Sequence, residues 1–146
     1  MVKEGSLPLM KEIHIFIDLC ATGTKQERND KINRLIQGVY SIAMFMIESG
    51  IPQAYIWYDK VNGVIQEYSV EQEEELYWMF QELFRSKTTT EESELMEAYV
   101  DWGKGRLLES ALYLTVADHE SLDSGNLVRD RLEVMDLRGD VIEEQV

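Results

Sequence analysis

The chain has 146 residues, 45% of them hydrophobic, and carries 28 acidic against 14 basic side chains, for a formal net charge of -14. This length suits one domain, with enough apolar residues for a sizeable core. The charge repels phosphate backbones and anionic membrane surfaces, so nucleic acid and membranes are both disfavoured as partners. We therefore expect a single domain over residues 1–146 that binds neither.

Cysteine usage and hydropathy bear on where the protein works. Cys20 is the only cysteine, so no disulfide can form within the chain, which is typical of a reducing compartment. No apolar run approaches the roughly 20 residues that span a bilayer. The start of the chain lacks the apolar segment of a signal peptide. The sequence therefore predicts a cytoplasmic location.

The first part of the chain predicts a strand and then a helix. Residues 13–19 form a short apolar run rich in β-branched side chains, typical of a strand buried on both faces. A polar loop with Gly23 follows, and residues 29–30 can cap a helix. Apolar side chains recur at the helical period over residues 32–47, and Gly50 ends the pattern.

A hairpin signal comes next. Residues 54–61 and 64–70 both resemble strands, and Asn62-Gly63 separates them. A type I′ turn needs positive φ at both central residues, which Asn-Gly tolerates better than other pairs. We therefore expect the second and third strands to be antiparallel neighbours.

The second half of the chain predicts two helices and up to three strands. Residues 71–87 have acidic side chains at their start and basic ones at their end, as the helix dipole favours. Thr88 or Thr89 can open a capping box for a further helix that runs to about Trp102. The remaining predictions are a strand over 111–117, a loop or short helix over 119–130, and two last strands over 132–137 and 141–146.

The order of predicted elements is β-α-β-β-α-α-β, followed by the two last strands. Strands that alternate with helices are typical of an α/β fold with a parallel sheet covered on both faces. We expect a three-layer, Rossmann-like sheet that is mostly parallel and has one antiparallel hairpin at its edge.

Two of the predicted strands are followed by a carboxylate, Asp18 after the first and Asp118 after residues 111–117. In open α/β sheets, ligands bind at the carboxyl ends of the strands, near the switch in strand order. If both strands are central neighbours, the two aspartates meet there, and the hydroxyls of Thr22 and Thr24 can join them. Such oxygen ligands suit Mg²⁺ or Mn²⁺.

The run Asp18-Leu19-Cys20-Ala21-Thr22 resembles the Asp-x-Ser-x-Ser segment that starts the metal-ion-dependent adhesion site of von Willebrand factor A-type domains. The hairpin, the threonine-rich loop and the strand before the second aspartate follow in that fold's order. The chain is more similar still to the bacterial branch known as domain of unknown function fifty-eight, over residues 1–137.

This resemblance implies a non-enzymatic role in protein–protein interaction or assembly. It implies that the chain is the C-terminal part of a larger protein, anchored by membrane helices that precede it. The implied location is then the cytoplasmic face of the membrane. The implied partner is a MoxR-type ATPase or its client, because members of this branch often occur beside such ATPases.

The resemblance also assigns metal ligands residue by residue. They are Asp18 as the first ligand, Cys20 in place of the first serine, Thr22 in place of the second, Thr89 or its neighbours Thr88 and Thr90 as the loop threonine, and Asp118 as the strand-end aspartate. A neutral thiol is a poor ligand for a hard cation. We therefore expect a degenerate site and a docking edge at Asp18–Thr24, with Mg²⁺ or Mn²⁺ as an optional bridge.

An enzymatic alternative is a metal-dependent, PIN-like nuclease. Asp18, Asp118 and a helix acid such as Asp101 would hold Mg²⁺ to activate water. The negative charge, the hydroxyl-rich loop and the hairpin all weigh against this alternative. Dinucleotide binding is disfavoured because no G-x-G-x-x-G follows the first strand.

Three residues also have simple structural interpretations. Asp18 can cap its own loop, and Cys20 can be a small buried residue, since free cysteine is among the most buried residue types. A reactive thiol would need a basic neighbour that lowers its pKa. Trp78 is expected to pack, as the other tryptophans are; because it is offset from the apolar face of its helix, the alternative is an exposed residue at an interface.

Overall fold

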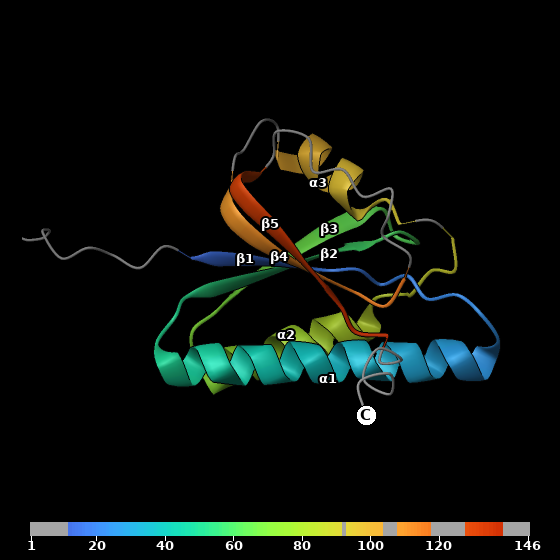
Figure 1. Cartoon of the computed structure of the whole chain (residues 1–146), viewed down its shortest axis with the longest axis horizontal. Coiled ribbons are helices and arrows are strands. Elements are labelled where there is room, and N and C mark those ends of the chain that lie inside the picture. Colours follow the sequence, from blue (N-terminus) through green and yellow to red (C-terminus); the bar gives the residue numbers. More distant parts are fainter. Residues whose placement is uncertain (1–11, 92, 104–107, 118–127, 139–146) are drawn as a thin grey trace, which may run out of the picture.

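The computed structural model describes residues 12–91, 93–103, 108–117 and 128–138, and it is shown in Figure 1. Its elements, in chain order, are β1 (Ile13–Ile17), α1 (Lys25–Ser49), β2 (Gln53–Asp59), β3 (Val64–Val70), α2 (Glu73–Arg85), α3 (Leu95–Gly103), β4 (Leu108–Thr115) and β5 (Val128–Asp136).

The strands form one five-stranded sheet in the order β3-β2-β1-β4-β5. β1 lies in the centre and pairs in parallel with both β2 and β4. β5 continues the parallel arrangement beside β4, and β3 is antiparallel to β2 at the other edge. The predicted α/β fold, with a mostly parallel sheet and one antiparallel edge hairpin, is confirmed.

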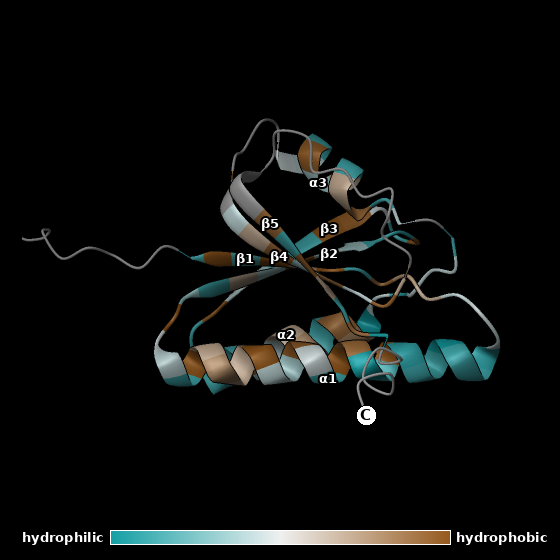
Figure 2. Ribbon diagram, in the orientation of Figure 1, coloured by the Kyte–Doolittle hydropathy of each residue, from teal (hydrophilic) through white to brown (hydrophobic). Residues whose placement is uncertain are grey.

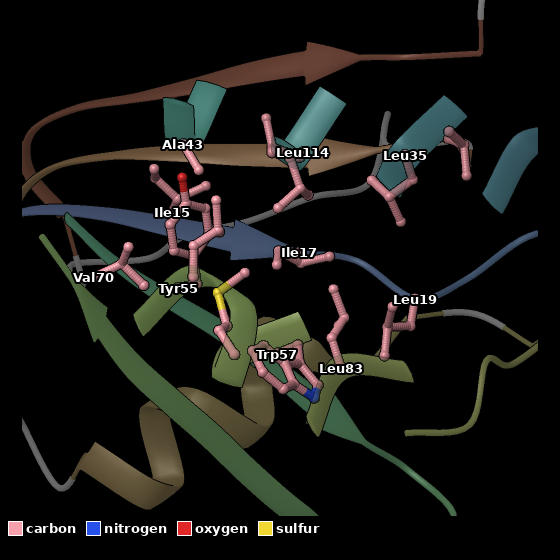
Figure 3. Packing of buried hydrophobic residues seen from close by; sticks show 14 of the residues in the cluster. Ile15, Ile17, Leu19, Leu35, Ala43, Tyr55, Trp57, Val70, Leu83 and Leu114 are labelled. Carbon is pink, nitrogen blue, oxygen red and sulfur yellow. The ribbon is translucent and has the colours of Figure 1, made fainter. Parts of the chain in front are cut away.

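Helices cover both faces of the sheet. Figure 1 shows α1 and α2 on one face and α3 on the other. Side chains alternate along β1, so Ile15 and Ile17 pack toward α1 and α2, whereas Phe16 packs toward α3 with Tyr99. Figure 3 shows the larger of these two clusters, in which Trp57 of β2 is fully buried. The three-layer arrangement follows from this alternation.

The hairpin between β2 and β3 is confirmed, but its turn is wider than predicted. Asp59 pairs with Val64, so four residues, 60–63, form the connection instead of two. The Asp59 carboxylate accepts hydrogen bonds from the backbone and side-chain nitrogens of Asn62, and Gly63 has a φ of 67°. These bonds stabilise the wider turn, and the left-handed conformation falls on the glycine.

Helix α1 begins earlier than its predicted cap at residues 29–30. The Thr24 hydroxyl accepts a hydrogen bond from the Glu27 backbone nitrogen at 3.2 Å, and the Glu27 carboxylate accepts one from the Thr24 nitrogen at 2.7 Å. This reciprocal capping box starts the helix at Lys25. The predicted start was therefore wrong, because the beginning of α1, which is hydrophilic in Figure 2, has no apolar stripe to reveal it.

The predicted start of α3 was also wrong. The helix begins at Leu95, whose backbone nitrogen donates to the Ser93 hydroxyl at 3.3 Å. Thr88 and Thr89 do not cap it, because the backbone of Thr89 pairs with that of Cys20 instead. Thr89, which the local sequence predicted as a helix cap, thus forms a tertiary contact with Cys20 instead.

The end of the sheet differs from the prediction as well. One strand, β5, runs over Val128–Asp136, where residues 132–137 were expected to be a strand and 119–130 a loop or short helix. The charged residues at 129–131 made the first part of β5 look like loop. The strand predicted over 141–146 lies outside the described residues, and so does Asp118.

Candidate functional site

The loop after β1 begins at the point where strand order reverses. β1 lies between β2, which follows it through α1, and β4, which comes much later in the chain. The Asp18 backbone nitrogen donates to the Leu114 carbonyl of β4 at 3.0 Å. The loop therefore lies at the carboxyl edge of the central strand, where α/β proteins place their ligands.

The Asp18 carboxylate is only 3% exposed, and both of its oxygens accept hydrogen bonds. One accepts from the Cys20 backbone nitrogen at 3.2 Å. The other accepts from the Tyr113 hydroxyl at 3.0 Å and from the Thr115 hydroxyl at 3.2 Å. Burial raises the pKa of Asp18, and the Ser93 hydroxyl together with these hydrogen bonds opposes that shift. The carboxylate caps its own loop and joins β1 to β4.

The same network reaches the start of α3. The hydroxyls of Tyr113 and Ser93 lie 3.3 Å apart, and Ser93 also accepts from the Leu95 nitrogen. Burial, and then the charge of Asp18, raise the pKa of Tyr113, so its hydroxyl stays protonated and available to donate. One buried carboxylate thus links β1, β4 and the entry to α3.

Cys20 is buried, as its structural interpretation expected. Its thiol donates to the Glu91 carbonyl at 2.8 Å. Burial, with a further contribution from the charge of Asp18, raises the pKa of Cys20 to about 11. The thiol is therefore neutral near pH 7, which makes it both a weak nucleophile and a poor ligand for a hard cation.

Backbone pairing fixes this loop against the loop that precedes α3. The Ala21 nitrogen donates to the Thr89 carbonyl, and the Thr89 nitrogen donates to the Leu19 carbonyl, both at 2.9 Å. The Thr89 hydroxyl accepts from the Glu91 nitrogen at 3.1 Å. The structure thus brings Thr89 to the edge, as expected, but the Thr89 hydroxyl forms its hydrogen bond within its own loop.

The outer part of the loop faces solvent. Thr22, Gly23 and Thr24 are exposed. The Lys31 ammonium donates to the Thr22 carbonyl at 3.0 Å, and the Arg28 guanidinium donates to the Gly23 carbonyl at 2.7 Å. Basic side chains of α1 thus bind the backbone carbonyls of two of these three exposed residues.

A second polar contact braces the edge from the β2 side. Lys60 donates to Glu91 at 2.7 Å and lies 3.3 Å from Glu94. The hydrogen bond to Glu91 raises the pKa of Lys60. This ion pair joins the hairpin turn to the loop before α3.

The described donors fit a divalent ion poorly. Within residues 12–91, 93–103, 108–117 and 128–138, no group of three or more His, Cys, Asp or Glu side chains is placed to hold a metal. Asp18 is committed to three donors and Cys20 is protonated. The metal assignment of Asp18, Cys20, Thr22, Thr89 and Asp118 stays a prediction.

The cavity that the described residues form beside Asp18 is small. It has a volume of about 10 Å³ and is lined by Asp18, Tyr58, Lys60, Ser93 and residues around them. This is room for about one water molecule. Asp101, the helix acid of the nuclease alternative, is exposed on α3 and does not line it.

Sequence reasoning found Asp18 and its loop but missed four other residues of the site, Tyr113, Ser93, Lys60 and Thr115. Tyr113, Ser93 and Lys60 come from elements distant in the sequence, so no local pattern pointed to them. Thr115 did carry a signal, since it is a hydroxyl in the otherwise apolar run 111–117. A polar residue in a buried strand needs a hydrogen-bond partner, and a neighbouring strand end supplies one.

The fold and the edge together define an α/β protein with a Rossmann-like mixed sheet. The chain matches no family model, and neither a curated protein nor a solved structure matches it. In the described part of the chain, no helix has both the length and the apolar character needed to cross a membrane.

Proposed function

We propose that the chain is a non-enzymatic protein-binding module, von Willebrand A-like in fold, which docks its partner through the edge at Asp18–Thr24. One observation carries the proposal. The inner half of this loop is fixed by the buried Asp18 carboxylate and by pairing with Thr89, while its outer half, Thr22 to Thr24, is exposed.

A loop held in this way is a suitable docking element. Binding costs free energy wherever a flexible segment must be ordered, and a loop that is already ordered avoids most of that cost. Sites supported by rigid elements and by hydrogen bonds behind them are also more selective. The network behind Asp18 supplies that support from β4 and from the entry to α3.

The buried carboxylate argues for a positioning role and against catalysis by Asp18. A nuclease that activates water through a metal needs ionised carboxylates open to that metal. Asp18 is shielded from solvent, and its pKa is raised by burial. Docking in this proposal therefore does not depend on Mg²⁺ or Mn²⁺.

The partner we propose is a MoxR-type ATPase or its client, with the chain acting at the cytoplasmic face of the membrane. Support comes from the Asp18-to-Thr22 run and the order of elements, which resemble the von Willebrand A-type domains of the bacterial branch described above. Because the chain has a net charge of -14, we expect that the contacting surface of the partner is not strongly acidic.

The experiment compares two variants in binding to a purified MoxR-type ATPase from the same organism. Thr22→Arg changes the exposed tip of the loop. Glu48→Arg is the matched control, because Glu48 is exposed near the end of α1, at the opposite edge of the sheet. We expect Thr22→Arg to weaken binding at least about tenfold and Glu48→Arg to change it less than about twofold.

Two results would overturn the proposal. One is equal affinity of the wild type and Thr22→Arg for an ATPase that does bind. The other is a nuclease activity of the purified chain that Asp18→Ala abolishes while the variant stays folded.

A further inference from the structure

A second surface, which shares none of its described lining residues with the docking edge, is the groove between α1 and α2. It has a volume of about 750 Å³. Ile36 and Tyr40 line it from α1, and Tyr77, Phe80 and Phe84 line it from α2. Both helices lie on the same face of the sheet in Figure 1, so this groove runs along the outside of one layer.

The aromatic side chains of this groove are exposed to an unusual degree. Tyr40 is 52% exposed, Tyr77 62% and Phe84 63%. Tyr40, Phe80 and Phe84 form a continuous row, since the ring centres of Tyr40 and Phe80 are 6.4 Å apart and those of Phe80 and Phe84 are 5.5 Å apart. Contiguous apolar surface of this kind marks interaction sites in soluble proteins.

The shape of the groove fits a helix. Tyr77, Phe80 and Phe84 recur at spacings of three and four residues along α2, so they form one stripe beside α1. Grooves of this kind accept an amphipathic helix whose anchors recur at the same spacing. α2 has 13 residues, which corresponds to a length of about 20 Å and to a ligand of three to four turns.

Charge identifies the kind of helix. Among the described residues that line the groove, Glu73 is the one that carries a charge. It belongs to an acidic first turn of α2 with Glu74 and Glu75. Within the described ranges, no basic side chain forms an ion pair with Glu73. A basic ligand is attracted electrostatically to this end of the groove, whereas an acidic ligand is repelled.

The net charge separates the possible occupants. A second copy would itself carry a net charge of -14 and be repelled by the first, and an anionic membrane would be repelled in the same way. A basic segment of another protein is attracted by both the local and the overall charge.

We propose that the groove between α1 and α2 binds an amphipathic helix of a partner protein, with its apolar face on Tyr40, Tyr77, Phe80 and Phe84 and its basic residues toward Glu73. This surface is independent of the docking edge at Asp18–Thr24.

The probe is a synthetic helix of about 14 residues, with leucine at the anchor spacing and lysine elsewhere. Its binding is measured by fluorescence anisotropy. Phe84→Ser and Tyr40→Ser are expected to weaken binding at least about tenfold. Trp78→Ser is the control, because Trp78 lies on the same helix and is 57% exposed but does not line the groove. We expect it to change the affinity less than about twofold.

The charge is tested separately. Glu73→Lys is expected to weaken binding of the lysine helix about threefold or more and to reduce its dependence on salt. A matched helix with glutamate in place of lysine is expected to bind the wild type at least about tenfold less tightly. Equal binding of the two helices would overturn the assignment of a basic ligand.

Four other results would overturn the proposal. One is the absence of binding up to about 1 mM peptide, and another is an equal loss with Trp78→Ser. A dimer that Phe84→Ser dissociates, seen by sedimentation equilibrium, would assign the groove to a second copy. Binding to phosphatidylserine vesicles that the same variant abolishes would assign it to a lipid surface.

Discussion

The Tyr113 hydroxyl donates to the Asp18 carboxylate at 3.0 Å, and the two residues are 95 positions apart in the sequence. Tyr113 belongs to β4 and Asp18 follows β1, so this bond spans the central pair of strands at their carboxyl ends. Thr115 adds a second bond from the same strand. The edge that we propose as a docking surface therefore depends on a contact that forms only when β1 and β4 lie side by side.

Tyr113→Phe is predicted to destabilise the fold. It removes a donor from the buried Asp18 carboxylate and also the partner of the Ser93 hydroxyl. A buried acceptor that loses one hydrogen bond costs about 1–3 kcal/mol. Urea unfolding measures the change. Tyr77→Phe is the control, since its hydroxyl is on an exposed residue, and it is expected to shift stability by less than about 0.5 kcal/mol. Equal effects of both variants would contradict the role of the Tyr113 hydroxyl.

Stability is predicted to depend on pH through Asp18. Burial raises the pKa of this carboxyl in the folded chain above its ordinary value of 3.8. The folded state therefore holds the proton more tightly than the unfolded state does. It follows that the contribution of Asp18 is fully present below pH 3.8 and is lost as the pH rises through the folded-state pKa.

Urea unfolding of the wild type and of Asp18→Asn over acid to neutral pH measures this effect. Asparagine does not titrate, and the other carboxyls cancel in the difference between the two proteins. We expect the stability of the wild type, relative to the variant, to fall as the pH rises above 3.8 and then to become constant. A difference that grows with pH would mean that the hydrogen bonds to the carboxylate outweigh its desolvation.

Much of the fold was predictable because its signals are local. The apolar run over residues 13–19, the helical period over 32–47 and the Asn62-Gly63 pair each specify an element without help from the rest of the chain. The start of β5 was not predictable in this way. Its first residues are largely charged, and the pairing with β4 makes them a strand.

Of the site, only Asp18 and its loop were predictable from the sequence. A carboxylate directly after a buried strand pointed to Asp18, and the loop was found at the expected edge. Its partners were missed because hydrogen bonds from Tyr113 and Ser93 depend on strand order and on the entry to α3. Local sequence also could not show that Thr89 would pair with Cys20 instead of capping a helix.

Cys20 is predicted to react slowly with thiol reagents in the folded protein. Its pKa is raised from 9.0 to about 11, chiefly by burial. Since the thiolate is the reactive form, this shift alone slows modification near neutral pH by about a hundredfold. Reaction with a disulfide reagent, followed by absorbance with and without urea, measures it. A folded-state rate close to that in urea would contradict the buried thiol and would revive its interpretation as a reactive residue.

Addition of Mg²⁺ is predicted to leave the docking edge unchanged. Both Asp18 oxygens accept hydrogen bonds, the Cys20 thiol is protonated, and the Lys31 ammonium holds the Thr22 carbonyl. A divalent ion would have to displace these donors before it could bind. Backbone amide shifts recorded up to about 10 mM Mg²⁺ or Mn²⁺ test this expectation. Asp18→Asn is the control, because weak binding at acidic surface residues such as Glu73 and Glu74 is common to both proteins. Saturable shifts at residues 18–24 in the wild type alone would contradict the prediction. They would establish a metal at this edge, and docking would then favour a partner that presents a carboxylate to it.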